Sequence, residues 1–177
     1  MRTGPPVAGV RVAMHGPEAA AAFRDRVLDV WRTAFGPVAD PQDWKQRFWE
    51  QHRSRADFRL VTAEAGEELL GFGWGYTGER GQWWADRVAA ALGPDAEQWV
   101  GAHFEFVELA VRPARQGQGL GGQLHAALMN GLPHQRALLQ TDADPLADGH
   151  RLYRARGWEV LGELPAGKVV MGKRLAA

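Results

Sequence analysis

The segment RPARQGQGLGGQLHAAL, residues 112–128, constrains the fold more than any other stretch of the chain. Four glycines stand in six positions, after a strand-like run and before a helical pattern. Glycine weakens ordinary structure, so this density indicates a backbone that takes unusual conformations or closely approaches another group. The start of a helix offers unpaired N–H groups and a positive dipole end, which suit a phosphate. The sequence therefore favours a phosphate-bearing ligand here over a tight turn without one.

A dinucleotide fingerprint is one alternative for this segment. Gly117, Gly119 and Gly122 fit G-x-G-x-x-G, and Asp142 lies twenty residues after the last of them,. The context argues against it, because RPARQ separates the preceding strand from the glycines and that strand carries two glutamates. Strands of such nucleotide-binding sheets are almost continuously apolar. Only 55 residues follow Gly122, too few to complete the fold.

Composition excludes several classes of protein. Lysine plus arginine and aspartate plus glutamate each number 21, and this balance argues against binding to bulk nucleic acid or anionic membranes,. The chain has no cysteine, so it has no disulfide, thiol nucleophile or cysteine zinc site, and we expect no metal,. Neither a signal peptide nor a membrane span is recognisable, and a cytoplasmic location is expected.

The element pattern predicts an α/β or α+β layered fold with a mixed sheet. Asp144 is expected to cap the last helix, and Gly157 to end it. The predicted strands cover 10–14, 57–65, 68–77, 103–111 and 135–141 and two further runs after residue 157. The predicted helices cover 16–35, 41–53, 81–93, 119–130 and 144–157, with a further helical turn over 95–100. No linker divides the chain, which indicates one domain over residues 1–177.

Two motifs resemble those of the GNAT N-acetyltransferase superfamily. Gln116-x-x-Gly119-x-Gly121 matches its acetyl-CoA signature, [QR]-x-x-G-x-[GA], after LAVRP. Tyr153, followed by Gly157-Trp158 in RLYRARGW, resembles its second conserved segment. The order of elements also fits the family from the first strand to the last. The resemblance implies a mixed, mainly antiparallel sheet flanked by helices.

The resemblance further implies an acyltransferase that moves an acetyl group from acetyl-CoA to a primary amine of a small molecule or peptide, by direct attack through a tetrahedral intermediate. A homodimer is consistent with it. Arg112 is a further candidate contact to the phosphoadenosine. The cofactor-binding residues that it implies are Leu109, Ala110, Val111, Arg115, Gln116, Gly117, Gln118, Gly119, Leu120, Gly121 and Gly122.

Tyr153 and Glu105 are the predicted catalytic residues. Tyr153 resembles the tyrosine that protonates the leaving CoA thiolate. Glu105 lies eleven residues before Gln116, the spacing of the catalytic glutamate in the histone-acetylating branch. A base is needed because an amine with a pKa of about 10.4 is mostly protonated at neutral pH. Glu108 and a water chain remain alternative bases, and a non-catalytic CoA-binding module remains an alternative function.

Other positions carry weaker expectations. His103, His125 and His150 are expected at the surface. Leu146 and Gly149 stand where many members of the family have asparagine and alanine, which departs from the family pattern at an asparagine that commonly contacts CoA. Tryptophan is abundant before residue 100, which favours core packing, with the lining of an acceptor pocket as the alternative,. The segment 77–102 is expected to fold over the acceptor site.

Overall fold

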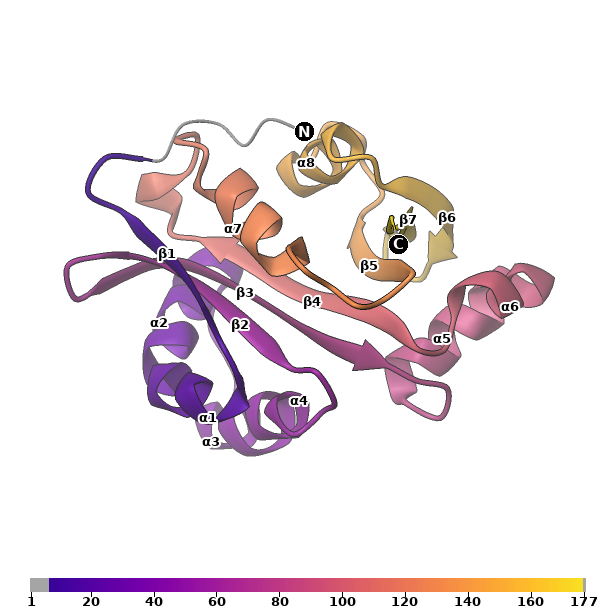
Figure 1. The fold of residues 1–177 in the computed structure, drawn as a ribbon, viewed down its shortest axis with the longest axis horizontal. Coiled ribbons are helices and arrows are strands. Elements are labelled where there is room, and N and C mark those ends of the chain that lie inside the picture. Colours follow the sequence, from indigo (N-terminus) through magenta and orange to yellow (C-terminus); the bar gives the residue numbers. More distant parts are fainter. Residues whose placement is uncertain (1–6, 177) are drawn as a thin grey trace. The chain divides into compact units, whose positions relative to one another are not determined.

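A computed structural model describes residues 7–176 and contains one seven-stranded mixed sheet (Figure 1). The strand order is β1-β2-β3-β4-β5-β7-β6. The strands are β1 (Arg11–His15), β2 (Arg59–Ala65), β3 (Glu68–Gly78), β4 (His103–Val111), β5 (Arg136–Asp142), β6 (Glu159–Leu164) and β7 (Lys168–Arg174). β4 pairs with β5 in parallel, whereas β1–β2, β2–β3, β5–β7 and β6–β7 pair antiparallel. The predicted fold class is confirmed.

The helices follow the predicted pattern, with breaks that the sequence did not indicate. The first predicted helix is α1 (Pro17–Ala20), a 3₁₀ turn η1 (Ala21–Phe23) and α2 (Arg24–Phe35). The second is α3 (Pro41–Asp43), a π-helical segment η2 (Trp44–Trp49) and α4 (Glu50–Arg53). The others are α5 (Trp83–Leu92), η3 (Gly93–Asp95), α6 (Ala96–Trp99), η4 (Pro113–Arg115), α7 (Leu120–Met129) and α8 (Asp148–Ala155).

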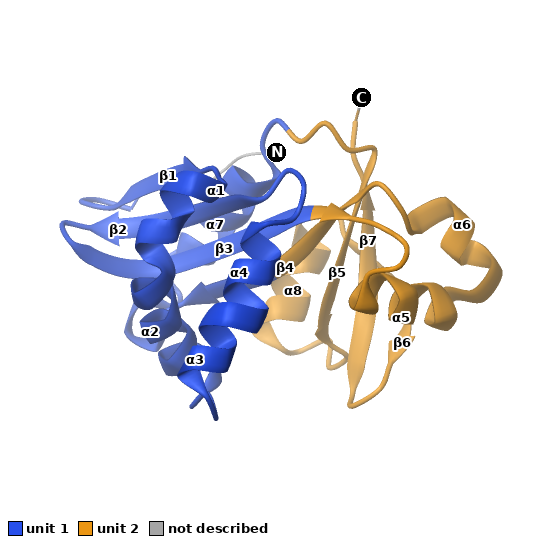
Figure 2. Cartoon of the chain, turned by 90° about the horizontal axis from the view of Figure 1, so that it is seen from below, with its two compact units in different colours: residues 1–76, 108–131 blue, residues 77–107, 132–177 orange. Residues whose placement is uncertain are grey.

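The chain divides into two compact units, which Figure 2 shows in different colours. Unit 1 comprises residues 1–76 and 108–131, and unit 2 comprises residues 77–107 and 132–177. The strands β3 and β4 each contribute residues to both units. That the whole of 1–177 acts as one domain stays a prediction, and its ends, residues 1–6 and 177, lie outside the described residues.

In unit 1, α7 covers one face of the strands and the helices α1–α4 cover the other (Figure 1). Glycine in β3 permits close packing on the α7 face. A Cβ atom on Gly71 would lie 2.8 Å from the carbonyl oxygen of Ala110 and 3.0 Å from Leu124 of α7. The neighbouring atom at the shorter distance belongs to the backbone, so it cannot easily move aside. This packing fixes the end of β4 against β3 and α7.

The opposite face of unit 1 is aromatic. Trp74 and Phe72 of β3 stack with ring centroids 5.4 Å apart, and Trp74 also meets Trp44, Phe48 and Trp49 of η2 edge-on. Such rings bury large apolar areas, and edge contacts add further stabilisation. The expectation that most of these tryptophans serve the core is therefore confirmed for this group.

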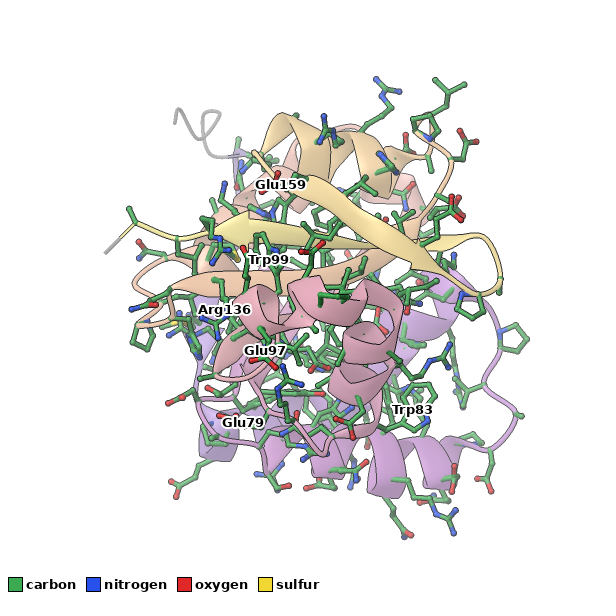
Figure 3. The ribbon with its side chains drawn as sticks, turned by 90° about the vertical axis from the view of Figure 1, so that its right-hand side faces the viewer. Glu79, Trp83, Glu97, Trp99, Arg136 and Glu159 are labelled. Atoms are coloured by element: carbon green, nitrogen blue, oxygen red, sulfur yellow. The ribbon has the colours of Figure 1, made fainter. Side chains whose placement is uncertain are left out.

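In unit 2, α8 lies on one face of β5–β7, and α5 and α6 lie on the other (Figure 2). Trp99 is buried and covers Gly172 of β7, where a Cβ atom would lie 2.6 Å from its ring. Arg136 donates to the carbonyl oxygens of Trp99 and Gly101, at 3.0 and 2.6 Å. Trp83, at the other end of the segment, is 71% exposed (Figure 3). Whether segment 77–102 covers an acceptor stays a prediction.

Two local expectations are wrong. The helix α8 begins at Asp148, not after Asp144, and its N-cap is Ala147. Asp144 instead accepts the N–H of Leu146 through its carboxylate and so forms a turn before the helix. The described histidines His103, His125 and His150 are buried rather than exposed.

In the described part of the chain, no helix has the length and apolar character needed to cross a membrane.

Candidate active site

The glycine segment forms a loop that opens directly into α7. Gly119 is the N-cap residue, with φ 86° and ψ 2°, and no side chain caps the helix. The N–H of Gln123 donates to the carbonyl oxygen of Gly119, which closes the first turn. The N–H groups before it point out of the start of the helix, where the helix dipole is positive. This is a site that suits a pyrophosphate.

No side chain covers the loop backbone at Gly117 and Gly119, where a phosphate would lie. Gly117 and Gly119 have φ of 75° and 86°, and a Cβ atom on either would meet no other atom within 4 Å. Side chains with a Cβ atom rarely adopt this conformation, and they would cover the N–H groups. The positive φ therefore explains two of the four glycines, and the open space beside them fits the diphosphate of a CoA thioester.

The polar side chains of the loop mainly hold its shape. Gln116 donates from its side-chain amide to the carbonyl oxygen of Val111, at 3.0 Å. Arg115 donates from Nε to the side-chain oxygen of Gln118, at 3.2 Å. Arg112 donates to the carbonyl oxygen of Leu69 at 2.7 Å and pairs with a carboxylate of α2 at 2.6 Å. Arg112 is thus engaged within unit 1, which leaves Arg115 as the arginine of this loop for a phosphate.

The end of β4 places Glu108 on the aromatic face of unit 1. A Cβ atom on Gly73 would lie 3.2 Å from Leu109, and one on Gly71 would lie 3.3 Å from Val111 and close to α7. Leu109 and Val111 thus face α7, and strand alternation directs Glu108 to the opposite face. Glu108 is half-buried, and burial raises the pKa of its carboxyl to about 8. Desolvation disfavours the charged form, which explains the direction.

Glu105 lies in unit 2 and is more deeply buried. Its Oε2 is 3.8 Å from Nε2 of His103, which is also fully buried. His103 accepts the backbone N–H of Gly101 at Nδ1, so its ring proton lies on Nε2, toward Glu105,. Gly78 of β3 leaves room for both, because a Cβ atom there would lie 2.9 Å from Oε2 of Glu105. The pair forms a buried polar contact in the sheet.

Tyr153 lies in α8, also in unit 2. Its ring meets Phe106 of β4 and Trp158 edge-on, with ring centroids 5.7 and 6.0 Å apart. Gly157 ends the segment with φ 78°, as expected for a left-handed residue after a helix,. His150, one turn before Tyr153, donates from Nδ1 to the carbonyl oxygen of Asp142 at 2.8 Å. The helix and the ring contacts therefore fix the tyrosine in one orientation.

Comparison with known proteins identifies the family. The profile of the acetyltransferase (GNAT) family matches residues 24–158, which include the glycine loop, Glu105, Glu108 and Tyr153. The chain belongs to the GNAT family of acetyltransferases. A GCN5-like protein acetyltransferase of Mycobacterium tuberculosis is 31% identical over 122 residues. That match covers 60% of this chain and 59% of the relative, so the chain spans less than two thirds of that protein.

Solved structures show the same GNAT fold. A protein of Pyrococcus horikoshii superposes with a TM-score of 0.66 at 16% identity, covering 94% of this chain and 100% of its own. The PaiA N-acetyltransferase of Thermoplasma acidophilum, solved in complex with coenzyme A, gives 0.59 at 13% identity, covering 94% and 99%. Identities this low establish the fold alone. The predicted membership of the GNAT acetyltransferase family is confirmed.

Sequence reasoning missed part of the GNAT chain's polar chemistry. His52 of α4 accepts the indole N–H of Trp74 at Nδ1, at 3.2 Å, and burial lowers its pKa to about 4. Its ring also meets Phe48 and Tyr76, with centroids 4.4 and 5.1 Å apart. Phe48 and His52 stand four positions apart on one helical run, which is the signal that would have linked them. Among the described residues, no cluster of histidine and carboxylate side chains suits a metal ion.

Proposed function

We propose that this chain is an acetyl-CoA-dependent N-acetyltransferase that acetylates a primary amine of a small molecule or peptide. The observation that carries the proposal is the loop from Gln116 to Gly119, which opens into α7 with no side chain capping the helix and open space beside Gly117 and Gly119. Membership of the GNAT family and a solved relative that holds coenzyme A support the choice of cosubstrate. The raised pKa of Glu108 supports the chemistry at the amine.

The proposed CoA site uses the residues predicted from the sequence. The N–H groups from Gln116 to Gly122 would hold the pyrophosphate, and Arg115 would reach a phosphate of the nucleotide end. The backbone of Leu109, Ala110 and Val111 would bind the pantetheine, as a strand edge binds an extended chain. When bound, acetyl-CoA supplies the activated acetyl group.

Glu108 is the proposed general base. An amine must lose a proton before it attacks a thioester, and a base works best when its pKa lies near the working pH. A pKa of about 8 gives Glu108 that property, and the residue is only partly buried. Glu105 is the second proposal for this role. Its Oε2 is buried beside His103, which favours a structural role for Glu105 instead.

Tyr153 is the proposed acid that returns a proton to the CoA thiolate. It is buried, and its edge contacts with Phe106 and Trp158 would keep the hydroxyl in place during turnover. Positioned proton donors of this kind contribute roughly 100-fold or more to a rate. The cytoplasmic location, the homodimer and the absence of nucleic-acid partners stay predictions.

The release of free thiol from acetyl-CoA in the presence of an amine panel tests the proposal. The panel contains amino acids, polyamines, aminoglycosides and lysine peptides, the last because the relative from M. tuberculosis is named a protein acetyltransferase. We expect amine-dependent thiol release that Glu108→Gln lowers at least 100-fold while acetyl-CoA binding is unchanged. Acetyl-CoA binding without amine-dependent release would instead support a non-catalytic CoA-binding module.

A further inference from the structure

Arg55 lies between α4 and β2, and its Nε has no hydrogen-bond partner among the described residues. This Nε is buried and donates to no carbonyl or carboxylate oxygen, while the guanidinium lies over the ring of Tyr76, 5.9 Å from its centre. The backbone around it is fixed, since the N–H of Arg55 donates to the carbonyl oxygen of His52. A buried donor without an acceptor is costly, and a charged one more so.

Neighbouring arginines show that this arrangement is unusual for the chain. Arg53 donates to Glu50 at 2.6 Å and to the carbonyl oxygen of Pro17 at 2.9 Å. Arg59 donates to the carbonyl oxygen of Asn130 at 2.8 Å. Arg55 stands between these two in the sequence, and in the described part of the chain its buried Nε has neither kind of acceptor. The missing acceptor is therefore expected to come from a ligand.

His52 supplies a second donor beside Arg55. Because Nδ1 of His52 accepts the indole N–H of Trp74, the proton of the neutral ring lies on Nε2,. The lowered pKa of about 4 keeps the ring neutral at physiological pH, and both burial and the charge of Arg55 lower it. His52 and Arg55 both lie against Tyr76, with the His52 ring centroid 5.1 Å from that of Tyr76.

We propose that Arg55 and His52 bind a carboxylate of the amine acceptor. This inference rests on the proposed function and adds the class of acceptor: an amine that carries a carboxylate and an apolar body. Arg55 provides one positive charge and the planar donor pattern that matches a carboxylate, while His52 adds one neutral N–H. One positive charge complements a monoanion better than a phosphate dianion. The apolar body would lie against Phe48, which is only partly buried, on the face that also holds Glu108.

The π-helical geometry of η2 is consistent with a binding role for this face. Residues Trp44–Trp49 form the π-helical segment immediately before α4. Segments of this kind are rare and occur frequently at functional sites. Here the segment ends one turn before His52 and presents Phe48 to it, with ring centroids 4.4 Å apart.

Calorimetric binding of phenylacetate, phenylacetamide and phenyl phosphate to the full chain tests the subsite. We expect phenylacetate to bind, and Arg55→Gln to weaken it roughly 10- to 100-fold, the range for a hydrogen bond to a charged group. Phenylacetamide has the same apolar body without the charge and should bind no better to the wild type than to the variant. Tighter, Arg55-dependent binding of phenyl phosphate would overturn the carboxylate assignment.

Arg47→Gln is the matched control, because Arg47 lies on the same helical run but its side chain is 84% exposed. If Arg55→Gln fails to fold, Arg55→Lys keeps the charge without the planar fork and should still weaken phenylacetate binding. Equal phenylacetate affinity in the wild type and either Arg55 variant would overturn the inference. Turnover of phenylalanine against phenylalaninamide is measured separately. If neither compound is acetylated while phenylacetate still binds in an Arg55-dependent way, the proposed acetyltransferase function fails. The proposed carboxylate site then stands.

Discussion

Replacing Glu108 by glutamine should stabilise the protein while it removes activity. The folded chain holds the carboxyl of Glu108 at a pKa of about 8, whereas the ordinary value is 4.5. Below pH 4.5 the group is neutral in both states and costs nothing. As the pH rises from 4.5 to 8, the unfolded chain loses the proton and the folded chain does not, so the folded state loses stability. Glutamine is neutral at every pH and avoids this loss.

The magnitude follows from the shift. One pKa unit corresponds to about 1.4 kcal/mol, so a pKa raised from 4.5 to about 8 implies that the wild type loses about 4 kcal/mol relative to the variant between pH 5 and pH 9,. Solvent that reaches the half-buried carboxyl lowers this figure. We therefore expect the stability difference between Glu108→Gln and wild type to grow by about 2–4 kcal/mol over that range.

Urea unfolding at pH 5, 7 and 9 measures this difference directly. Glu159→Gln on the exposed face of β6 serves as the control and should show no comparable trend. A stability difference between Glu108→Gln and wild type that stays constant with pH, or that falls as the pH rises, would refute the assigned environment of Glu108. The same variant should lose the limb near pH 8 in the pH dependence of kcat/KM, which reports the ionisation of the free enzyme,.

The remaining predictions concern the glycine loop, the proposed acid Tyr153 and the packing of Gly71 in the sheet. Gly119→Ala places a Cβ atom on a residue with φ 86°, so CoA affinity measured by calorimetry should fall about tenfold,. Unchanged CoA affinity would count against the glycine loop as the pyrophosphate site. Tyr153→Phe should lower kcat roughly 100-fold and leave the KM for acetyl-CoA unchanged; a lower melting temperature with normal kcat would indicate a packing role only. Gly71→Ala should cost about 1–3 kcal/mol because of the nearby carbonyl oxygen of Ala110,. Thermal melting checks it, with Gly16→Ala as control, since a Cβ atom there meets no other atom within 4 Å.

The loop and its strand could be predicted because their signals are local. Glycines that adopt a positive φ indicate a turn. The run HFEFVELAV, predicted as a strand, has the same bounds as the observed strand His103–Val111. Tyr153 and Gly157 were predicted from a short motif. Tyr153 lies in α8, and Gly157 follows the end of that helix. These features depend on neighbours within a few residues.

Features that depend on distant residues could not be predicted in this way. His103 was expected at the surface but is buried, because it packs against Gly78 of β3 and beside Glu105. The burial of Glu108, which raises the pKa of its carboxyl, follows from packing in the folded sheet and not from its neighbours in the sequence. The burial of Nε of Arg55 without a hydrogen-bond acceptor likewise shows only in the folded chain.

The fate of the acetyl group tests the central claim most directly. The protein is incubated with acetyl-CoA labelled in the acetyl group and with the amine panel, and the products are analysed by mass spectrometry. We predict label on an amine nitrogen of at least one acceptor, present with the wild type and strongly reduced with Glu108→Gln. Saturable CoA binding with no label on any amine would contradict the account.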